Sequence, residues 1–459
     1  MTSENSSLHG KNPFLIGNQE KVMSIKIYKQ GSKGFEKCLS RLKSRFTGIP
    51  KKIEAQVKRI GERVKKEGDQ ALIEFTEKFD KVRLSLDELR VTEEEIKRAY
   101  EEVDSELISA IKLAIKKVED FHKKTLPSSW FDAKEGIIYG QKVTPVDSVG
   151  LYIPGGKGGE TPLISTVVMT AIPASIAGVE RIVMVSPPRK DKTLHPALIV
   201  AGKECGVKEI YKVGGPWSIF ALAYGTQSIK KVDLICGPGN IYVTTAKKLV
   251  SAFTGIDIIA GPSEVVVIAD ESANPEFICW DLLAQAEHDP MSLPILITTS
   301  YKLAKKVKNL IEEALKQDWV RSAAKESITK QGAILVVGDL EIAIELANKV
   351  APEHLELAIK EPMLWLSKVR HAGAVFLGEW TPETVGDYAG GPNHVLPTMG
   401  FARFCSSLSV EKFCKKVNFL CYSEEALLRE GSQIIKLAEA ENLFCHAQAV
   451  KIRIKYLHS

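Results

Sequence analysis

The sequence predicts an α/β fold with two Rossmann-like parallel-sheet domains and small helical domains at the N- and C-terminal ends. Three observations predict this class. Short β-branched segments alternate with helical ones, which is the pattern of β-α-β units. The alternation occurs in two sets, one on each side of Gly261-Pro262. A chain of 459 residues is long enough for roughly two to four domains.

The elements follow from the spacing of apolar residues. From 51 to 117, apolar residues recur at helical spacing with charged residues on the other face. After about Ser407 the chain is again helical and basic, with a last strand signal at 447–456. The expected strands of the first set are 149–153, 181–185, 210–213 and 232–236, and those of the second are 265–269, 294–298, 333–337 and 374–377.

Composition excludes several classes of protein. The net charge of +5 is small against 62 basic and 57 acidic residues, and the two signs interleave, so no nucleic-acid surface is expected. No apolar run approaches the roughly 18 residues of a membrane helix. The eight cysteines form no C-x-x-C pair, as is typical of reduced thiols in the cytoplasm. Residues 1–24 are polar and lack the apolar core of a secretory signal, so we expect a disordered tail.

Two glycine-rich loops follow expected strands, at 155–159 and at 237–240. Neither has the G-x-G-x-x-G spacing. Glycines after a parallel strand let backbone amides approach an anion at a helix start, and ligands bind at the carboxyl ends of such strands. The two loops favour a nucleotide site, with plain turns as the alternative.

Four segments each pair a histidine with a carboxylate or an amide. Gln285 and His288 lie in an expected helix at 281–289, where their spacing puts them on one face and lets them bind a divalent cation. The alternative is a structural histidine in the core. Glu353 and His354 follow Pro352 at what reads as a helix start, and such a pair can divide proton-transfer work. The alternative is an exposed first turn.

The other two segments lie further along the chain. Asp387 and His394 belong to a glycine-rich loop at 385–394, which otherwise reads as a plain turn. Glu441 and His446 lie at the end of an expected helix, which alone is more often a solvated terminus. Four such segments suit one site assembled from several elements.

Together these segments resemble the histidinol dehydrogenase family. The resemblance covers about 25–454, and its motifs occur in the family's order. They are G-L-Y-I-P-G-G at 150–156, G-P-G-N at 237–240, G-P-S-E-V at 261–265, L-A-Q-A-E-H-D at 283–289, A-P-E-H-L-E-L at 351–357, G-D-Y-A-G-G-P-N-H at 386–394 and E-N-L-F-C-H at 441–446.

The resemblance implies a four-electron oxidation of L-histidinol to L-histidine through histidinal, with two NAD. It implies one Zn²⁺ per subunit, with the ligands Gln285, His288, Asp387 and His446. His354 would be the general base and Glu353 would activate water. The implied substrate-binding residues are those six together with Ser263, His394 and Glu441, and the implied NAD contacts are Tyr152, Trp217 and Asn240.

The resemblance also implies an intertwined homodimer in which Glu441 and His446 serve the partner's site. The expected domains are a small N-terminal segment at 25–46, a metal and catalytic α/β domain at 47–151 and 263–403, an NAD-side α/β domain at 152–262, and a dimerisation domain at 404–459. Trp217 and Ser148 depart from the usual Gln and Arg of the family. The alternatives are a related dehydrogenase for another small polar alcohol, and a non-catalytic metal- or nucleotide-binding protein.

Overall fold

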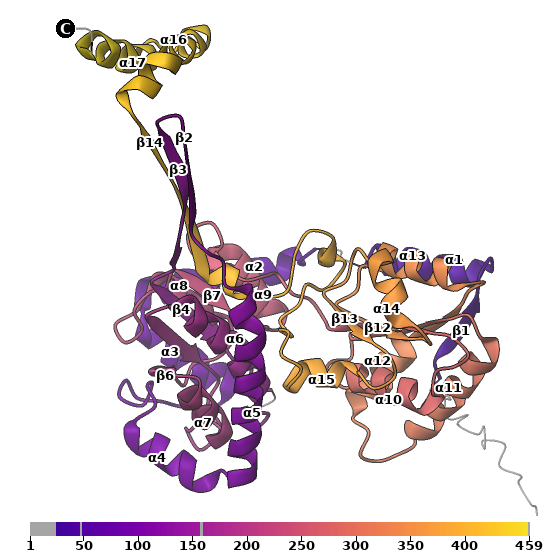
Figure 1. Ribbon diagram of the computed structural model, residues 1–459. Coiled ribbons are helices and arrows are strands. Elements are labelled where there is room, and N and C mark those ends of the chain that lie inside the picture. The colour runs from indigo at the N-terminus through magenta and orange to yellow at the C-terminus, as the bar shows by residue number, and fades with distance from the viewer. Residues whose placement is uncertain (1–23, 46–47, 157–158, 458–459) are drawn as a thin grey trace, which may run out of the picture.

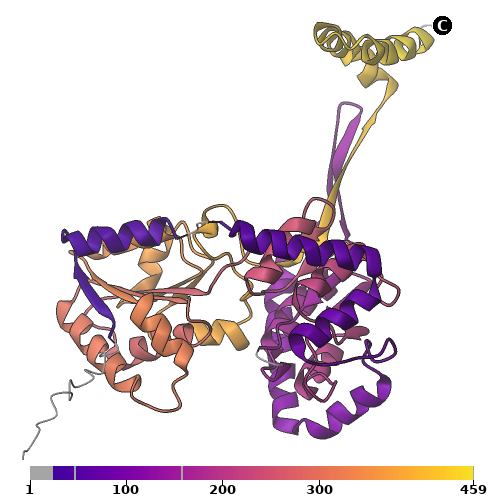
Figure 2. The same cartoon turned by 180° about the vertical axis from the view of Figure 1, so that it is seen from behind.

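Two parallel sheets organise the chain into two domains, and a thin arm projects from one of them (Figures 1 and 2). The computed structural model describes residues 24–45, 48–156 and 159–457. The expected disordered tail at 1–24 lies outside the described residues except for Ser24. The two predicted parallel-sheet domains are confirmed.

The six-stranded domain contains a fully parallel sheet in the order β1-β11-β10-β9-β12-β13. Every residue of its central strands β9 and β10 is buried, as in a parallel sheet covered by helices on both faces. Its strands are β1 (Lys26–Lys29), β9 (Glu264–Ala269), β10 (Leu293–Thr298), β11 (Ala333–Val336), β12 (His354–Ala358) and β13 (Ala374–Leu377). Its helices are α1 (Lys33–Lys43), α10 (Pro275–Ala286), α11 (Tyr301–Ala314), α12 (Ser322–Lys330), α13 (Leu340–Val350), α14 (Pro362–Trp365) and α15 (Glu383–Tyr388).

The five-stranded domain contains a second parallel sheet in the order β6-β5-β4-β7-β8. Its strands are β4 (Ser148–Tyr152), β5 (Arg181–Val185), β6 (Glu209–Tyr211), β7 (Leu234–Cys236) and β8 (Gly255–Ile256). Its helices are α2 (Lys51–Glu67), α3 (Asp69–Phe75), α4 (Glu93–Glu102), α5 (Ser105–His122), α6 (Ile164–Ala177), α7 (Pro196–Glu204), α8 (Gly215–Tyr224) and α9 (Ile241–Val250).

The expected domain boundaries need two corrections. Helices α2 to α5 and strand β4 belong with 152–262, because α2 packs on α8 and α9 and β4 lies at the centre of the five-stranded sheet, whereas β2 and β3 belong to the arm described below. At the helix contact, a Cβ on Gly61 would lie 2.7 Å from the Phe220 ring, so α2 and α8 approach closely. The segment 25–46 is no separate domain, because β1 pairs with β11 as an edge strand of the six-stranded sheet.

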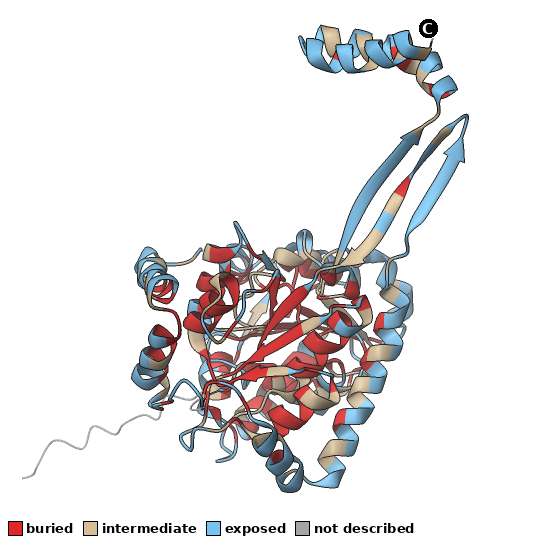
Figure 3. Cartoon of the chain, turned by 90° about the vertical axis from the view of Figure 1, so that its left-hand side faces the viewer, coloured by how far each residue is buried: buried red, intermediate tan, exposed pale blue. Residues whose placement is uncertain are grey.

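The arm consists of a three-stranded antiparallel sheet that carries two helices away from both domains (Figures 1 and 3). Strand β14 (Cys414–Tyr422) pairs along its whole length with β3 (Ile137–Pro145), and β2 (Trp130–Lys134) pairs with β3 on the other side. The helices are α16 (Glu424–Ala440) and α17 (Phe444–Leu457). The expected strand at 447–456 is therefore wrong, because the alternating apolar residues there lie on a helix.

Candidate functional site

His354 is the first residue of strand β12, between β9 and β13, and Glu353 directly precedes it. The expected helix start is wrong, because His354 pairs in register with Val265 of β9 and Ala374 of β13. Both side chains are buried. The pair therefore lies at the amino ends of the parallel strands, next to Ser263, which directly precedes β9.

The main chain of Glu264 holds both side chains. Its N–H donates to the Glu353 carboxylate at 2.8 Å, and its C=O lies 2.9 Å from Nδ1 of His354. A carbonyl oxygen can only accept, so Nδ1 carries the proton and Nε2 carries the lone pair. This Nε2 atom is buried and has no hydrogen-bond partner among the described residues. The imidazole is therefore in the tautomer of a base, with its basic atom open to a ligand.

Burial shifts the titration of both groups in opposite directions. It raises the pKa of Glu353 well above its usual range, and the Glu264 and Asp387 carboxylates add to the rise. Burial lowers the pKa of His354 to about 3, against the opposing effect of its bond to Glu264. His354 is thus neutral at pH 7, and Glu353 is a far stronger base than an exposed carboxylate once it is ionised.

Gln285 lies beside Glu353 and His354, in the last turn of α10. Its neighbours place the amide nitrogen toward Oε2 of Glu383 at 2.8 Å and the Glu264 carbonyl at 3.3 Å. The amide oxygen, which is the end that binds metals, lies on the other side. Helix α10 ends at Ala286, so His288 lies in the turn after the helix rather than within the expected helix. Pro290 follows closely and cannot continue a helix.

His288, Asp387 and His394 form a second group. Nε2 of His288 lies 4.0 Å from Oδ2 of Asp387, and Nδ1 of His394 lies 3.9 Å from Oδ1 of the same carboxylate. Two atoms bound to one tetrahedral zinc lie about 3.3 Å apart, so His288 and Asp387 would have to approach by less than about 1 Å to share an ion. Burial raises the pKa of Asp387 to about 7 and lowers that of His394 to about 4. A cation beside Asp387 would stabilise its charged form.

The described residues contain no group of three His, Cys, Asp or Glu side chains placed to hold a metal. Of the expected zinc ligands, one chain brings together only the imidazole of His288, the carboxylate of Asp387 and the amide of Gln285. His446 and Glu441 lie on the arm and are exposed. The structure of one chain therefore brings together Gln285, His288, Glu353, His354, Asp387 and His394 with Ser263 nearby, and it does not bring Glu441 or His446 to them (Figure 1).

The expected NAD residues lie at the carboxyl ends of strands in the five-stranded domain. Tyr152 ends β4, and its hydroxyl is bonded by the Gly215 main chain. Asn240 caps α9, where its Oδ1 accepts from the N–H groups of Tyr242 and Val243 at 3.0 and 3.2 Å. Trp217 is 4% exposed and stacks on Phe79 at 5.3 Å. Trp217 is therefore too buried to present much surface to a ligand, and it packs behind Phe79.

Comparison with known proteins decides the family. The histidinol dehydrogenase family model matches residues 44–454. A histidinol dehydrogenase of Desulfotalea psychrophila is 52% identical over 354 residues, covering 77% of this chain and 82% of that protein. One from Carboxydothermus hydrogenoformans is also 52% identical, with the same coverage. The crystal structure of histidinol dehydrogenase from Elizabethkingia anophelis matches with a TM-score of 0.89 and 39% identity, covering 95% of this chain and 99% of that one.

The chain belongs to the histidinol dehydrogenase family. Histidinol dehydrogenases oxidise histidinol to histidine in histidine biosynthesis, so the chain is an oxidoreductase and the resemblance in the sequence is confirmed. None of the described helices is long and apolar enough to cross a membrane. All eight cysteines are free.

Two residues of this histidinol dehydrogenase site were missed in the sequence. Glu264 lies within the G-P-S-E-V motif, but the motif alone assigns it no role. Glu383 begins α15, is buried, and has Oε2 3.6 Å from Nδ1 of His354. No local signal marks Glu383, since its neighbours become adjacent only in the folded chain.

Ser148, which departs from the usual arginine of the family, lies at the amino end of β4, where its hydroxyl donates to Asp233 at 2.7 Å. It therefore lies at the opposite end of β4 from Tyr152.

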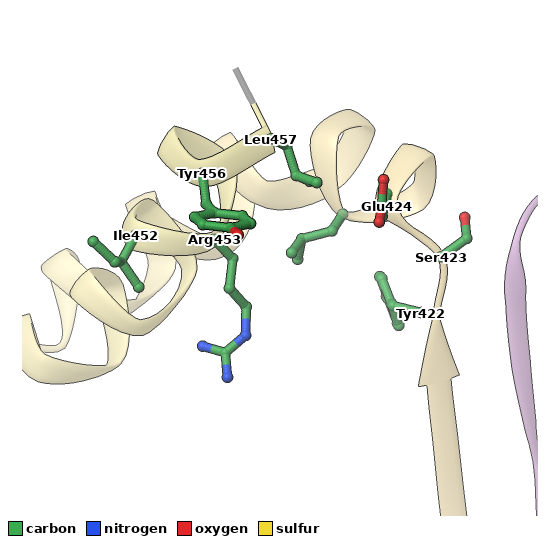
Figure 4. Close-up of a pocket in the computed structure, with 8 residues that line it drawn as sticks. Tyr422, Ser423, Glu424, Ile452, Arg453, Tyr456 and Leu457 are labelled. Carbon is green, nitrogen blue, oxygen red and sulfur yellow. The ribbon is translucent and has the colours of Figure 1, made fainter. Parts of the chain in front are cut away.

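A hollow with apolar residues in its lining lies on the arm, away from Glu353 and His354. Tyr422, Ile452, Leu457 and their neighbours line it, between the end of β14 and helix α17 (Figure 4). Other apolar side chains of the arm are exposed, namely Val417, Leu420, Leu437, Leu443 and Phe444. Single exposed apolar residues are ordinary, but a row of them on a projecting element marks an interaction surface.

Proposed function

We propose that the chain catalyses the NAD-dependent oxidation of L-histidinol to L-histidine through histidinal, with His354 as general base and Glu353 as the group that activates water. The observation that carries this assignment is the bond from Nδ1 of His354 to the Glu264 carbonyl. It leaves a buried, unprotonated Nε2 as the one ring atom able to take a proton.

The first oxidation removes a proton and a hydride from the alcohol. Nε2 of His354 takes the hydroxyl proton while the hydride leaves the adjacent carbon, which gives the aldehyde. Bound NAD supplies the two-electron acceptor for each oxidation. Tyr152 and Asn240, at the carboxyl ends of β4 and β7, would hold it, and Trp217 would support the pocket through Phe79.

The second oxidation needs water. The Glu353 carboxylate takes a proton from water as the water oxygen bonds to the aldehyde carbon, and the hydrate then loses a hydride and a proton to give the carboxylic acid. Burial raises the pKa of Glu353 and so brings it toward the range in which a base works near neutrality. One site thus needs two proton-handling groups, and the adjacent residues Glu353 and His354 supply them.

Gln285, His288 and Asp387 would hold the zinc, together with His446 of a second copy. An amide oxygen, two imidazoles and one carboxylate are ligands that zinc accepts in proteins. Bound there, the ion would orient the substrate imidazole and amine. Ser263 and His394 contact the substrate from this chain, and Glu441 from the second copy.

The active form is a homodimer whose two copies exchange arms. The support is the exposed position of Glu441 and His446, together with the apolar residues exposed along the arm. Mixing D387A and H446A subunits tests it. Each variant alone lacks a metal ligand, but a mixed dimer keeps one intact site. Random mixing then restores about a quarter of the wild-type activity. No recovery on mixing would contradict the exchange.

The function itself is tested with L-histidinol, NAD and metal analysis. The variant H354N should lower kcat by about 10²- to 10⁴-fold and leave the zinc content unchanged. The matched control is H371N, because His371 lies outside the site and carries no motif. A near-normal rate for H354N would remove His354 as the base. NADH from another small polar alcohol but none from L-histidinol would assign a different substrate. The free cysteines agree with a cytoplasmic location.

A further inference from the structure

The side chain of Glu264 forms a bidentate ion pair with Arg45. Nε of Arg45 donates to Oε1 of Glu264 at 2.5 Å, and Nη2 donates to Oε2 at 2.7 Å. The two side chains are 12% and 3% exposed. Oε1 also accepts from the N–H of Met399 at 3.0 Å. A buried carboxylate with three donors fixed around it cannot rotate, and its main chain is fixed with it.

Arg45 also binds the segment that leads to the catalytic pair. Its Nη2 lies 3.3 Å from the carbonyl oxygen of Ala351, and Nη1 donates to the carbonyl of Leu42 at 2.6 Å. Ala351 has φ 50°, a left-handed conformation that costs a non-glycine residue energy and needs outside support. Arg45 therefore connects the end of α1 with the first residue of β9 and with the turn before Glu353.

The geometry points to Arg45 and Glu264 as positioning residues for the reaction, an inference that rests on the proposed roles of Glu353 and His354. The ion pair fixes the main chain of Glu264, whose N–H holds the Glu353 carboxylate and whose C=O holds the His354 ring. The ends of strands open locally more easily than their centres. Without the pair, the two reacting groups keep their chemistry but lose their alignment.

The test compares R45M and E264Q with the control R181M. Arg181 forms a bidentate pair with Glu209 in the five-stranded domain, at 2.8 and 3.1 Å, and touches none of the site residues described above. A misplacement of about 1 Å costs roughly 10²-fold in rate, so R45M and E264Q should lower kcat by about 30- to 100-fold. KM should stay within about threefold and zinc content should not change, because the ligands are not altered. R181M should keep kcat within about twofold of wild type.

Two further variants separate positioning from general damage. R45K retains the charge but cannot form the double bond, and should recover part of the lost kcat. If R45M does not fold, R45K and E264Q carry the test. The double variant R45M/E264Q should be no slower than the slower single one, because both changes break the same unit.

The kinetics of these variants separate the positioning role from the proposed function. If H354N is inactive while R45M, R45K and E264Q all keep kcat within about threefold, the positioning inference is overturned and the proposed function stands. If KM rises and zinc content falls together with kcat, the pair acts on the whole domain and the inference is also overturned. A nearly normal H354N would remove the proposed function, and the inference with it.

Discussion

The loop before α9 is held by a buried ion pair whose loss should be costly. Lys247 and Asp257 form this pair, and their side chains are 3% and 0% exposed. Nζ of Lys247 donates to the carbonyl of Gly237 at 2.9 Å, and the N–H of Gly237 donates to Oδ2 of Asp257 at 2.7 Å. Gly237 has φ 120°, and a Cβ there would lie 2.0 Å from the Tyr152 carbonyl oxygen. The pair therefore fixes the start of the loop that carries Asn240.

The substitution K247M removes the cation and leaves a buried carboxylate. Breaking a buried pair from one side costs about 3–5 kcal/mol, because the remaining charge has no partner. The double variant K247M/D257N should regain about 2 kcal/mol of that loss, since a neutral amide can still accept from the Gly237 N–H. The matched control is the next residue, K248M. Lys248 pairs with Glu54 at the surface, so its loss should cost below about 1 kcal/mol.

Urea unfolding followed by circular dichroism measures these differences, and calorimetry measures NAD binding to the folded variants. K247M should also bind NAD more weakly, because the Gly237 loop loses one of its two anchors. The reasoning fails if K247M and K248M lose the same stability. It fails equally if K247M/D257N is less stable than K247M, because the unpaired Asp257 charge would then not explain the loss of stability.

Three further predictions concern single residues. D387A should lower zinc affinity by more than about tenfold, and an unchanged zinc count after dialysis would exclude Asp387 as a ligand. His122 is buried and its pKa is lowered to about 4, against about 6.5 in the unfolded chain, so its stabilising contribution is complete above pH 6.5 and is lost as the pH falls toward 4. Between pH 8 and pH 5 the loss is about 2 kcal/mol, and urea unfolding of H122L should lack this part of the pH dependence. W217Q should cost about 3 kcal/mol of stability, because it empties the contact with Phe75 and Phe79, and should not tighten NAD binding in calorimetry.

The two parallel sheets could be predicted because their strands are buried on both faces. Such strands are continuous runs of apolar, mostly β-branched residues, and the expected strands at 181–185 and 265–269 fall on β5 and β9. The domain to which each helix belongs could not be predicted. Helix α2 has one apolar stripe that fits any apolar neighbour, and only the close approach at Gly61 selects α8.

At the site, strand pairing with residues distant in the sequence overrides the local preference for a helix. Ala351-Pro352-Glu353 has the composition of a helix start, yet the chain continues as strand β12 from His354, which pairs with β9. The residue types of the site were visible in the sequence, since His354 and Glu353 are adjacent in any conformation. The tautomer of His354 was not, because it depends on a carbonyl 90 residues away in the chain.

The two halves of the site use opposite ends of their sheets, and electrostatics gives a reason. Helices after parallel strands present their N-termini at the carboxyl ends of the strands, where the positive end of the helix dipole favours phosphate. Tyr152 and the Gly237 loop lie at that end in the five-stranded domain, beside the N-terminus of α9. A metal cation is favoured instead by the negative end of a helix dipole, at the C-terminus of the helix. Gln285 lies in the last turn of α10 and Asp387 in that of α15, where the dipoles are negative. The rule that ligands bind at the carboxyl ends of strands therefore agrees with the proposed NAD half of this site and misplaces the half that would hold a cation.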